Sequence, residues 1–133
     1  MRNRAVFYWL DKPEILAQQR LLIDIYGGAH GVLNEGALDS TLARPVNLNA
    51  YEGVDDPCRL AACYGYGFAK NHCFVDGNKR VALVTMDVFL GLHDLDLCAS
   101  EPEAVAIILA LCTDDLNEDE LARWLRLNTR PLD

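Results

Sequence analysis

Residues 70–80, in the middle of the chain, hold a dense group of side chains that could do chemistry. His72 can accept a proton from a hydroxyl group near neutral pH, because the ordinary pKa of imidazole lies close to that range. Asp76 can hold Mg²⁺ against phosphate oxygens, since this ion commonly takes one or two carboxylates and keeps several waters. A base and a magnesium ligand this close together are two of the parts that phosphoryl or nucleotidyl transfer needs.

The residues that follow Asp76 predict a phosphate cradle. Gly77 lets the backbone turn tightly and come close to a ligand, and Asn78 stands where the cap of a helix is expected. The free amides of such a helix N-terminus bind phosphate. Lys79 and Arg80 fall in the first turn, where positive charge opposes the helix dipole unless an anion is bound. Their placement therefore indicates a bound anion.

The residue types alone leave other interpretations of this segment open. It fits an exposed polar connection in which Asp76 and Gly77 form a turn and the two cations are solvated. His72 beside Cys73 suggests a thiol nucleophile, but adjacent loop residues rarely point at one another, and no third orienting group is evident. A metal site formed by His72, Cys73 and Asp76 has no stronger support.

The composition limits the class of protein. The 133 residues are 51% hydrophobic and 24% charged, which is typical of one globular domain, here residues 1–133. Lys and Arg number 12 and Asp and Glu 20, and the resulting net charge of −8 argues against direct nucleic-acid binding. Five cysteines without a Cys-x-x-Cys pair indicate reduced thiols in the cytoplasm.

Two apolar stretches are too short for membrane or export functions. The longest uninterrupted run, 104–112, falls far short of the ~20 residues of a spanning helix, so no membrane association is expected. Near the start, Arg2 and Arg4 precede an apolar run over 5–10 only, which is too brief for a secretory signal.

Start and stop signals predict an all-α fold around the reactive segment. We expect a first helix over 13–26 and a short second helix from Asn34 and Glu35 to Leu42, which stops before Pro45. A loop is expected over 44–55. Strand-like alternation is present only over 6–10.

Asp56 and Pro57 predict the start of a third helix with one apolar face. From Lys79 to Leu92 nearly every position is apolar, which predicts a helix at the centre of a bundle. The reactive segment would then connect these two helices.

Two capping boxes predict the last two helices. Ser100 to Glu103 opens an apolar helix through 104–112, and Asn117 to Glu120 opens another. The apolar face of the final helix is formed by Leu121, Trp124 and Leu125.

Three polar residues lie outside the reactive segment. His30 and His93 stand beside glycine-marked helix ends and are expected on the surface. Asp87 lies within the apolar helix, where its carboxylate is either buried and hydrogen-bonded or turned toward a partner.

The run from His72 to Arg80 resembles the signature of the Fic/Doc family, His-x-Phe-x-Asp-(Ala/Gly)-Asn-Lys-Arg, in its Doc (death-on-curing) branch. The resemblance extends through 34–45 and 69–71, and the order of the downstream helices fits, so it covers nearly the whole chain. It implies an all-helical Fic-type bundle whose motif loop joins two central helices. A small flap, placed within 44–55 and able to form a β-hairpin, would lie over the active site.

The resemblance also implies a role for each motif residue. His72 would deprotonate a target hydroxyl, Phe74 would anchor the loop in the core, and Asp76 would bind Mg²⁺. ATP phosphates would lie in a cradle formed by Gly77, Asn78, Lys79 and Arg80. These roles agree with those inferred from the residue types.

Three positions depart from the usual family pattern. Members that transfer AMP usually have Gly at the position of Lys79 and a second Arg at the position of Leu83, whereas Doc-type relatives bind the nucleotide inverted and transfer its γ-phosphate. Both departures favour ATP-dependent protein kinase chemistry on Ser or Thr hydroxyls over adenylylation. Cys73 replaces the usual Pro, which frees the backbone after His72 and puts the rigidity of the loop in question.

The family resemblance implies a biological role as well. Doc is the toxin of a toxin–antitoxin pair: it phosphorylates a threonine of elongation factor Tu and halts translation, and a Phd-like antitoxin folds a disordered tail onto it. The auto-inhibitory Ser/Thr-x-x-x-Glu-(Gly/Asn) motif of many Fic proteins is absent, which fits restraint by a separate partner. AMP transfer to a protein hydroxyl and a catalytically inactive binding module are the alternative functions.

Overall fold

The computed structural model describes residues 6–132, which form six helices and two short strands. The expected all-α class is therefore confirmed. Arg2 and Arg4, which were considered for a secretory signal, lie outside the described residues. The elements are α1 (Lys12–Tyr26), α2 (Glu35–Glu52), α3 (Pro57–Lys70), α4 (Asn78–Leu92), β1 (Leu95–Leu97), α5 (Glu101–Cys112), α6 (Glu118–Leu127) and β2 (Thr129–Pro131).

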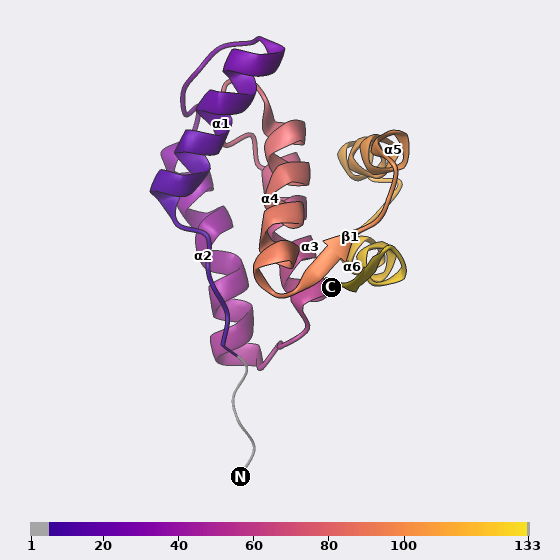
Figure 1. Ribbon diagram of the computed structural model, residues 1–133. Coiled ribbons are helices and arrows are strands. Elements are labelled where there is room, and N and C mark those ends of the chain that lie inside the picture. Colours follow the sequence, from indigo (N-terminus) through magenta and orange to yellow (C-terminus); the bar gives the residue numbers. More distant parts are fainter. Residues whose placement is uncertain (1–5, 133) are drawn as a thin grey trace.

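Helices α3 and α4 form the centre of the bundle, with α1 and α2 on one side and α5 and α6 on the other (Figure 1). The buried side of α3 includes Leu60, Tyr64 and Phe68, which are all fully buried. Gly65 brings α4 close, because a Cβ at that position would overlap the side chain of Met86. The prediction of a central apolar helix after the reactive segment is confirmed.

The predicted end of the second helix before Pro45 is wrong. Helix α2 continues through Pro45 to Glu52 and ends at Gly53, which adopts the left-handed conformation. Thr41, Pro45 and Leu48 recur on one buried face of α2. Burial of this face offsets the cost of a proline inside a helix, which is about 3 kcal/mol.

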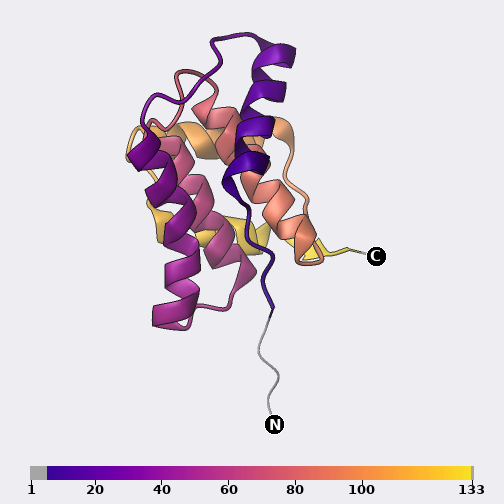
Figure 2. The same cartoon turned by 90° about the vertical axis from the view of Figure 1, so that its left-hand side faces the viewer.

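The predicted placement of the flap and the hairpin within 44–55 is consequently wrong, because α2 occupies most of this segment. The strand pair lies elsewhere, because β1 pairs antiparallel with β2 and joins residues far apart in the sequence. Residues 6–10, which alternate like a strand, form no regular element. Figure 2 shows them as an extended segment that leads into α1.

Helix α5 lies at the edge of the bundle despite its apolar sequence. Ala104, Ile108 and Leu111 are buried, whereas Val105 and Leu109 are 44% and 48% exposed. In the described part of the chain, no helix is both long and apolar enough to cross a membrane.

Most of the predicted helix starts are confirmed. Asp56 caps α3, with Pro57 as its first residue, and α6 begins with the complete Asn117–Glu120 capping box. Ser100 caps α5, because its hydroxyl oxygen accepts from the Glu103 amide. The Glu103 carboxylate accepts from the Ser100 hydroxyl, whereas in a complete capping box it would accept from the Ser100 backbone amide.

The predictions for the three polar residues outside the reactive segment have different outcomes. His30 is exposed, as expected, and pairs with Asp24 at 2.7 Å. His93 is half-buried: its ring accepts from the Tyr8 amide and packs against Phe89, so it lies at the surface with one side covered. Asp87 is exposed, which excludes the buried alternative, and a role toward a partner stays a prediction.

Candidate active site

The motif loop connects the two central helices, as expected from the sequence. Phe74 holds the middle of the loop in the core: it is 1% exposed, and its ring stacks on Phe68 with 6.2 Å between centroids. The flanking side chains of His72 and Asp76 are exposed. The loop therefore has a buried anchor between two accessible polar residues.

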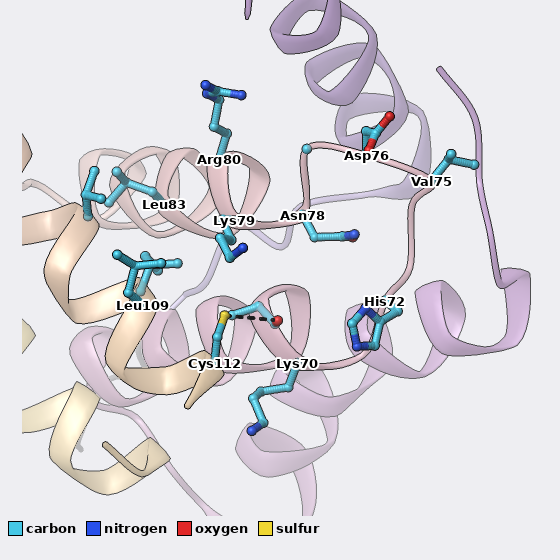
Figure 3. Close-up of a pocket in the computed structure, with 14 residues that line it drawn as sticks. Lys70, His72, Val75, Asp76, Asn78, Lys79, Arg80, Leu83, Leu109 and Cys112 are labelled. Carbon is cyan, nitrogen blue, oxygen red and sulfur yellow. Dashed lines mark hydrogen bonds between the residues drawn. The ribbon is translucent and has the colours of Figure 1, made fainter. Parts of the chain in front are cut away.

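The loop borders a cleft of about 580 Å³. His72, Asp76 and the first residues of α4 line its polar part (Figure 3). Its apolar part lies between α4 and α5 and is lined by Leu83, Val105, Ile108, Leu109 and Cys112. The structure therefore brings all the predicted site residues together along one cleft, and adds an apolar wall that the sequence did not assign.

The start of α4 differs from the prediction in one respect. Gly77, not Asn78, is the cap residue, and its φ of +82° is a conformation that favours glycine. A Cβ at this position would also approach Ile23 at 3.2 Å. Among the described residues, no side chain caps α4. The first amides of α4 thus remain available to an anion at the cleft.

Asn78 stabilises the loop instead of capping the helix. Its side-chain oxygen accepts from the Phe74 amide and its side-chain nitrogen donates to the Phe74 carbonyl, both at 3.0 Å. This paired bond closes the loop onto the start of α4. The sequence predicted Asn78 as the cap of this helix, which is wrong, and as a member of the phosphate cradle, which stays a prediction.

The segment over 27–34, which we call the flap segment, packs along the motif loop. The Val75 amide donates to the Gly31 carbonyl at 3.1 Å, and the Leu33 amide donates to the Cys73 carbonyl at 2.9 Å. An isolated antiparallel bridge joins Val32 to Phe74. The segment that borders the reactive loop therefore precedes α2, whereas the sequence placed it after Leu42.

Asp76 is held by the flap segment. Its carboxylate accepts from the Ala29 amide at 2.7 Å. Gln19, a buried residue of α1, donates to the Asp76 carbonyl at 3.2 Å and to the Ala29 carbonyl at 3.4 Å. Gln19 was not predicted as a site residue, although a polar residue between Ile15 and Ile23 on one helix face was an available signal.

A metal site built from protein ligands alone is not supported. Within residues 6–132, no cluster of three or more His, Cys, Asp or Glu side chains could hold an ion. Asp76 by itself fits Mg²⁺, because that ion takes one or two carboxylates and completes its shell with waters and substrate phosphates. The alternative site formed by His72, Cys73 and Asp76 is excluded by the burial of Cys73.

The thiol of Cys73 points into the core. It is fully buried and lies 3.5 Å from the Thr41 hydroxyl. Burial raises the pKa of this thiol, whereas a nucleophilic cysteine needs a lowered pKa. These observations argue against the Cys73 nucleophile that the sequence left open.

The two cations of the cradle differ in direction. Lys79 lies beside the cleft, whereas Arg80 extends away from His72 (Figure 3). The Arg80 guanidinium lies 4.4 Å from the centre of the Tyr26 ring at the end of α1. Tyr26 is a second site residue that was not predicted, since nothing in the sequence indicates that it lies near Arg80.

This arrangement defines a class of protein: an all-helical bundle whose signature loop joins its two central helices and borders a cleft. Residues 9–90 match the Fic/DOC family, and the chain belongs to that family. The match includes the motif loop and the flap segment. Membership in this family supports a transferase activity.

Two curated relatives are similar to nearly the whole chain. "Protein kinase doc" of Escherichia phage P1 is 29% identical over 117 residues, which is 88% of this chain and 92% of that protein. "Toxin Doc" of Mycolicibacterium smegmatis is 33% identical over 122 residues, which is 88% of this chain and 90% of that protein.

Proposed function

We propose that this protein is a toxin that transfers the γ-phosphoryl group of ATP to a Ser or Thr hydroxyl of another protein. The observation that carries the proposal is the placement of His72, Asp76 and the uncapped start of α4 along one cleft. A hydroxyl base, a magnesium ligand and an anion site are the parts that this transfer requires. The family membership supports the use of ATP.

In this mechanism each residue has a role that its position supports. His72 is exposed at the cleft and accepts the proton of the target hydroxyl. The first amides of α4, together with Lys79 and Arg80, bind the phosphates and stabilise the charge of the transition state. Asp76 would hold Mg²⁺, which when bound would neutralise charge on the phosphate oxygens.

Two residues favour γ-phosphoryl transfer over AMP transfer. Lys79 places a bulky cation in the first turn of α4, where AMP-transferring members usually have Gly. Leu83, which also lines the cleft, stands where those members have a second Arg. These residues change how a triphosphate is seated, in the direction expected for an inverted nucleotide.

The biological setting is inferred from the two relatives, of which one is named a kinase and the other a toxin. We assign this chain to a toxin–antitoxin module in which it acts in the cytoplasm as one domain. Its target is a translation factor, with elongation factor Tu as the first choice. A Phd-like antitoxin restrains it and supplies the DNA-binding surface.

The test uses purified protein with elongation factor Tu, Mg²⁺ and ATP labelled at either the γ or the α phosphate. Label on the target from γ but not from α is expected. His72→Ala should lower this transfer at least ~100-fold, because general base catalysis contributes about that much. His30→Ala is the matched control, since it removes an exposed histidine outside the cleft and should leave the rate unchanged.

Each other outcome contradicts the proposal in a defined way. Label from α would establish AMP transfer. Undiminished transfer in His72→Ala would remove the assigned base. A folded protein that binds no ATP–Mg²⁺ by calorimetry would be a binding module.

A further inference from the structure

A single buried hydroxyl holds the residues on both sides of His72. Thr41, on α2, is only 2% exposed, and its hydroxyl donates to the Ala37 carbonyl at 2.7 Å. The same oxygen accepts from the Asn71 side-chain nitrogen at 2.9 Å. It also lies 3.5 Å from the Cys73 sulfur. Thr41 therefore contacts the residue before His72 and the residue after it.

His72 depends on its backbone for orientation. Its φ of +50° is a left-handed conformation that non-glycine residues rarely adopt, so the surrounding contacts must maintain it. Its imidazole forms no hydrogen bond with any of residues 6–132. The contacts of Asn71 and Cys73 thus determine where the ring lies relative to the cleft.

We propose that Thr41 is a positioning residue for His72, acting through Asn71 and Cys73. The hydroxyl couples α2 to the motif loop and maintains the backbone conformation from which the imidazole faces the cleft. Cys73 replaces the usual proline after His72, which put the rigidity of the loop in question. The contact between the Cys73 thiol and Thr41 restrains the loop at this position. The kinetic part of the inference rests on the proposed function, but its structural part does not.

The hydroxyl and the methyl group of Thr41 have separate partners. A Cβ built at Gly67 would lie 2.6 Å from the Thr41 methyl carbon, so that methyl packs closely against α3. Thr41→Val keeps this packing and removes the hydroxyl, whereas Thr41→Ser keeps the hydroxyl and removes the methyl. These variants distinguish positioning through the hydroxyl from packing of the helices.

The first measurement is amide hydrogen exchange of the full chain, which requires no catalytic activity. The Leu33 and Asn34 amides report on the loop because both donate to the Cys73 carbonyl. In Thr41→Val their exchange should accelerate about tenfold, the equivalent of about one net hydrogen bond. In Thr41→Ser it should change less than about twofold, and amides within α4 should be unaffected in both variants.

The second measurement is the transfer reaction itself. Thr41→Val should lower kcat at least about tenfold and change the KM for ATP less than about twofold, because the phosphate cradle is untouched. Thr41→Ser should keep kcat within about threefold of the wild type. If the wild type transfers nothing, the proposed function fails, and hydrogen exchange alone then decides whether Thr41 positions the loop.

Three results would overturn the inference. Unchanged loop exchange in Thr41→Val would show that the hydroxyl does not restrain the loop. Equal effects of Thr41→Val and Thr41→Ser would show that Thr41 acts through packing of the helices. A higher KM for ATP in Thr41→Val at unchanged kcat would show that Thr41 acts on ATP binding. If Thr41→Val does not fold, Asn71→Ala replaces it, because the Asn71 side chain is exposed. This variant should show faster exchange of the Leu33 amide and a lower kcat. The absence of both effects would reject the proposal.

Discussion

At the residue scale, we expect Lys79 and Leu83 to determine which group of the nucleotide is transferred. Both line the cleft, and both differ from the residues usual in AMP-transferring members. We expect a Lys79→Gly, Leu83→Arg double variant to transfer label from the α phosphate and to lose at least about tenfold of its γ transfer, since seating of the triphosphate would change.

The measurement is the double-label assay on the target protein. Lys79→Arg is the control, because it keeps a bulky cation at the same place and should still transfer from γ. Retention of pure γ transfer in the double variant would show that other residues determine the orientation of the nucleotide.

A second residue-scale prediction concerns Tyr26 and Arg80. The Arg80 guanidinium lies over the Tyr26 ring at the edge of the cleft, and we expect it to leave this ring when it contacts a phosphate. An exposed contact of this kind contributes about 0.5–1 kcal/mol, so Tyr26→Leu should tighten ATP binding about two- to fivefold. Tyr26→Phe keeps an aromatic face and should bind like the wild type. Calorimetry gives both constants, and weaker binding in Tyr26→Leu would instead mean that the ring presents Arg80 to the phosphate.

At the element scale, the packing of α3 on α4 depends on Gly65. A Cβ there would overlap the fully buried Met86 side chain, which has little room to move. Gly65→Ala should therefore lower the free energy of unfolding by about 1–3 kcal/mol, despite the better helix propensity of alanine.

Gly91→Ala is the matched control for this substitution. Gly91 also lies in a helix, but a Cβ there meets nothing within 4 Å. Its free energy of unfolding in urea should be unchanged or raised by up to about 1 kcal/mol. Equal stabilities of the two variants would show that Met86 adjusts freely.

At the scale of the whole molecule, the core predicts how stability depends on pH. Burial raises the pKa of Tyr64 to about 12 and that of the adjacent Cys63 to about 12. Both groups are neutral in the folded core and ionise more readily in the unfolded chain. Their contribution to the free energy of unfolding is therefore complete below about pH 9 and is lost as the pH rises toward 12. We expect the free energy of unfolding to fall by about 4 kcal/mol between pH 8 and pH 11.

Urea titrations across this range check the prediction. Tyr64→Phe should weaken the decline with pH, because one of the two ionising groups is removed. It should also lower stability at neutral pH, since the Tyr64 hydroxyl accepts from the buried Leu10 amide at 3.2 Å. A stability that does not change up to pH 11 would contradict the assigned burial of both groups.

Local sequence signals determined much of the fold and the location of the candidate site. Capping residues such as Asp56 and Asn117 predicted helix starts, because a cap acts on amides only two or three residues away. The density of polar groups over 70–80 located the loop, and the family resemblance supplied a role for each residue. These features depend on neighbours in the chain, which a sequence shows directly.

Only the tertiary structure decided the features that depend on distant partners. Pro45 lies inside α2 because burial of its helix face offsets a local penalty, and α5 lies at the edge because α3 and α4 already form the centre. The flap segment adjoins the motif loop through backbone bonds that carry no sequence signature. Thr41 meets Asn71 across 30 residues, and such a contact follows from the packing of α2 on α3 rather than from any local pattern.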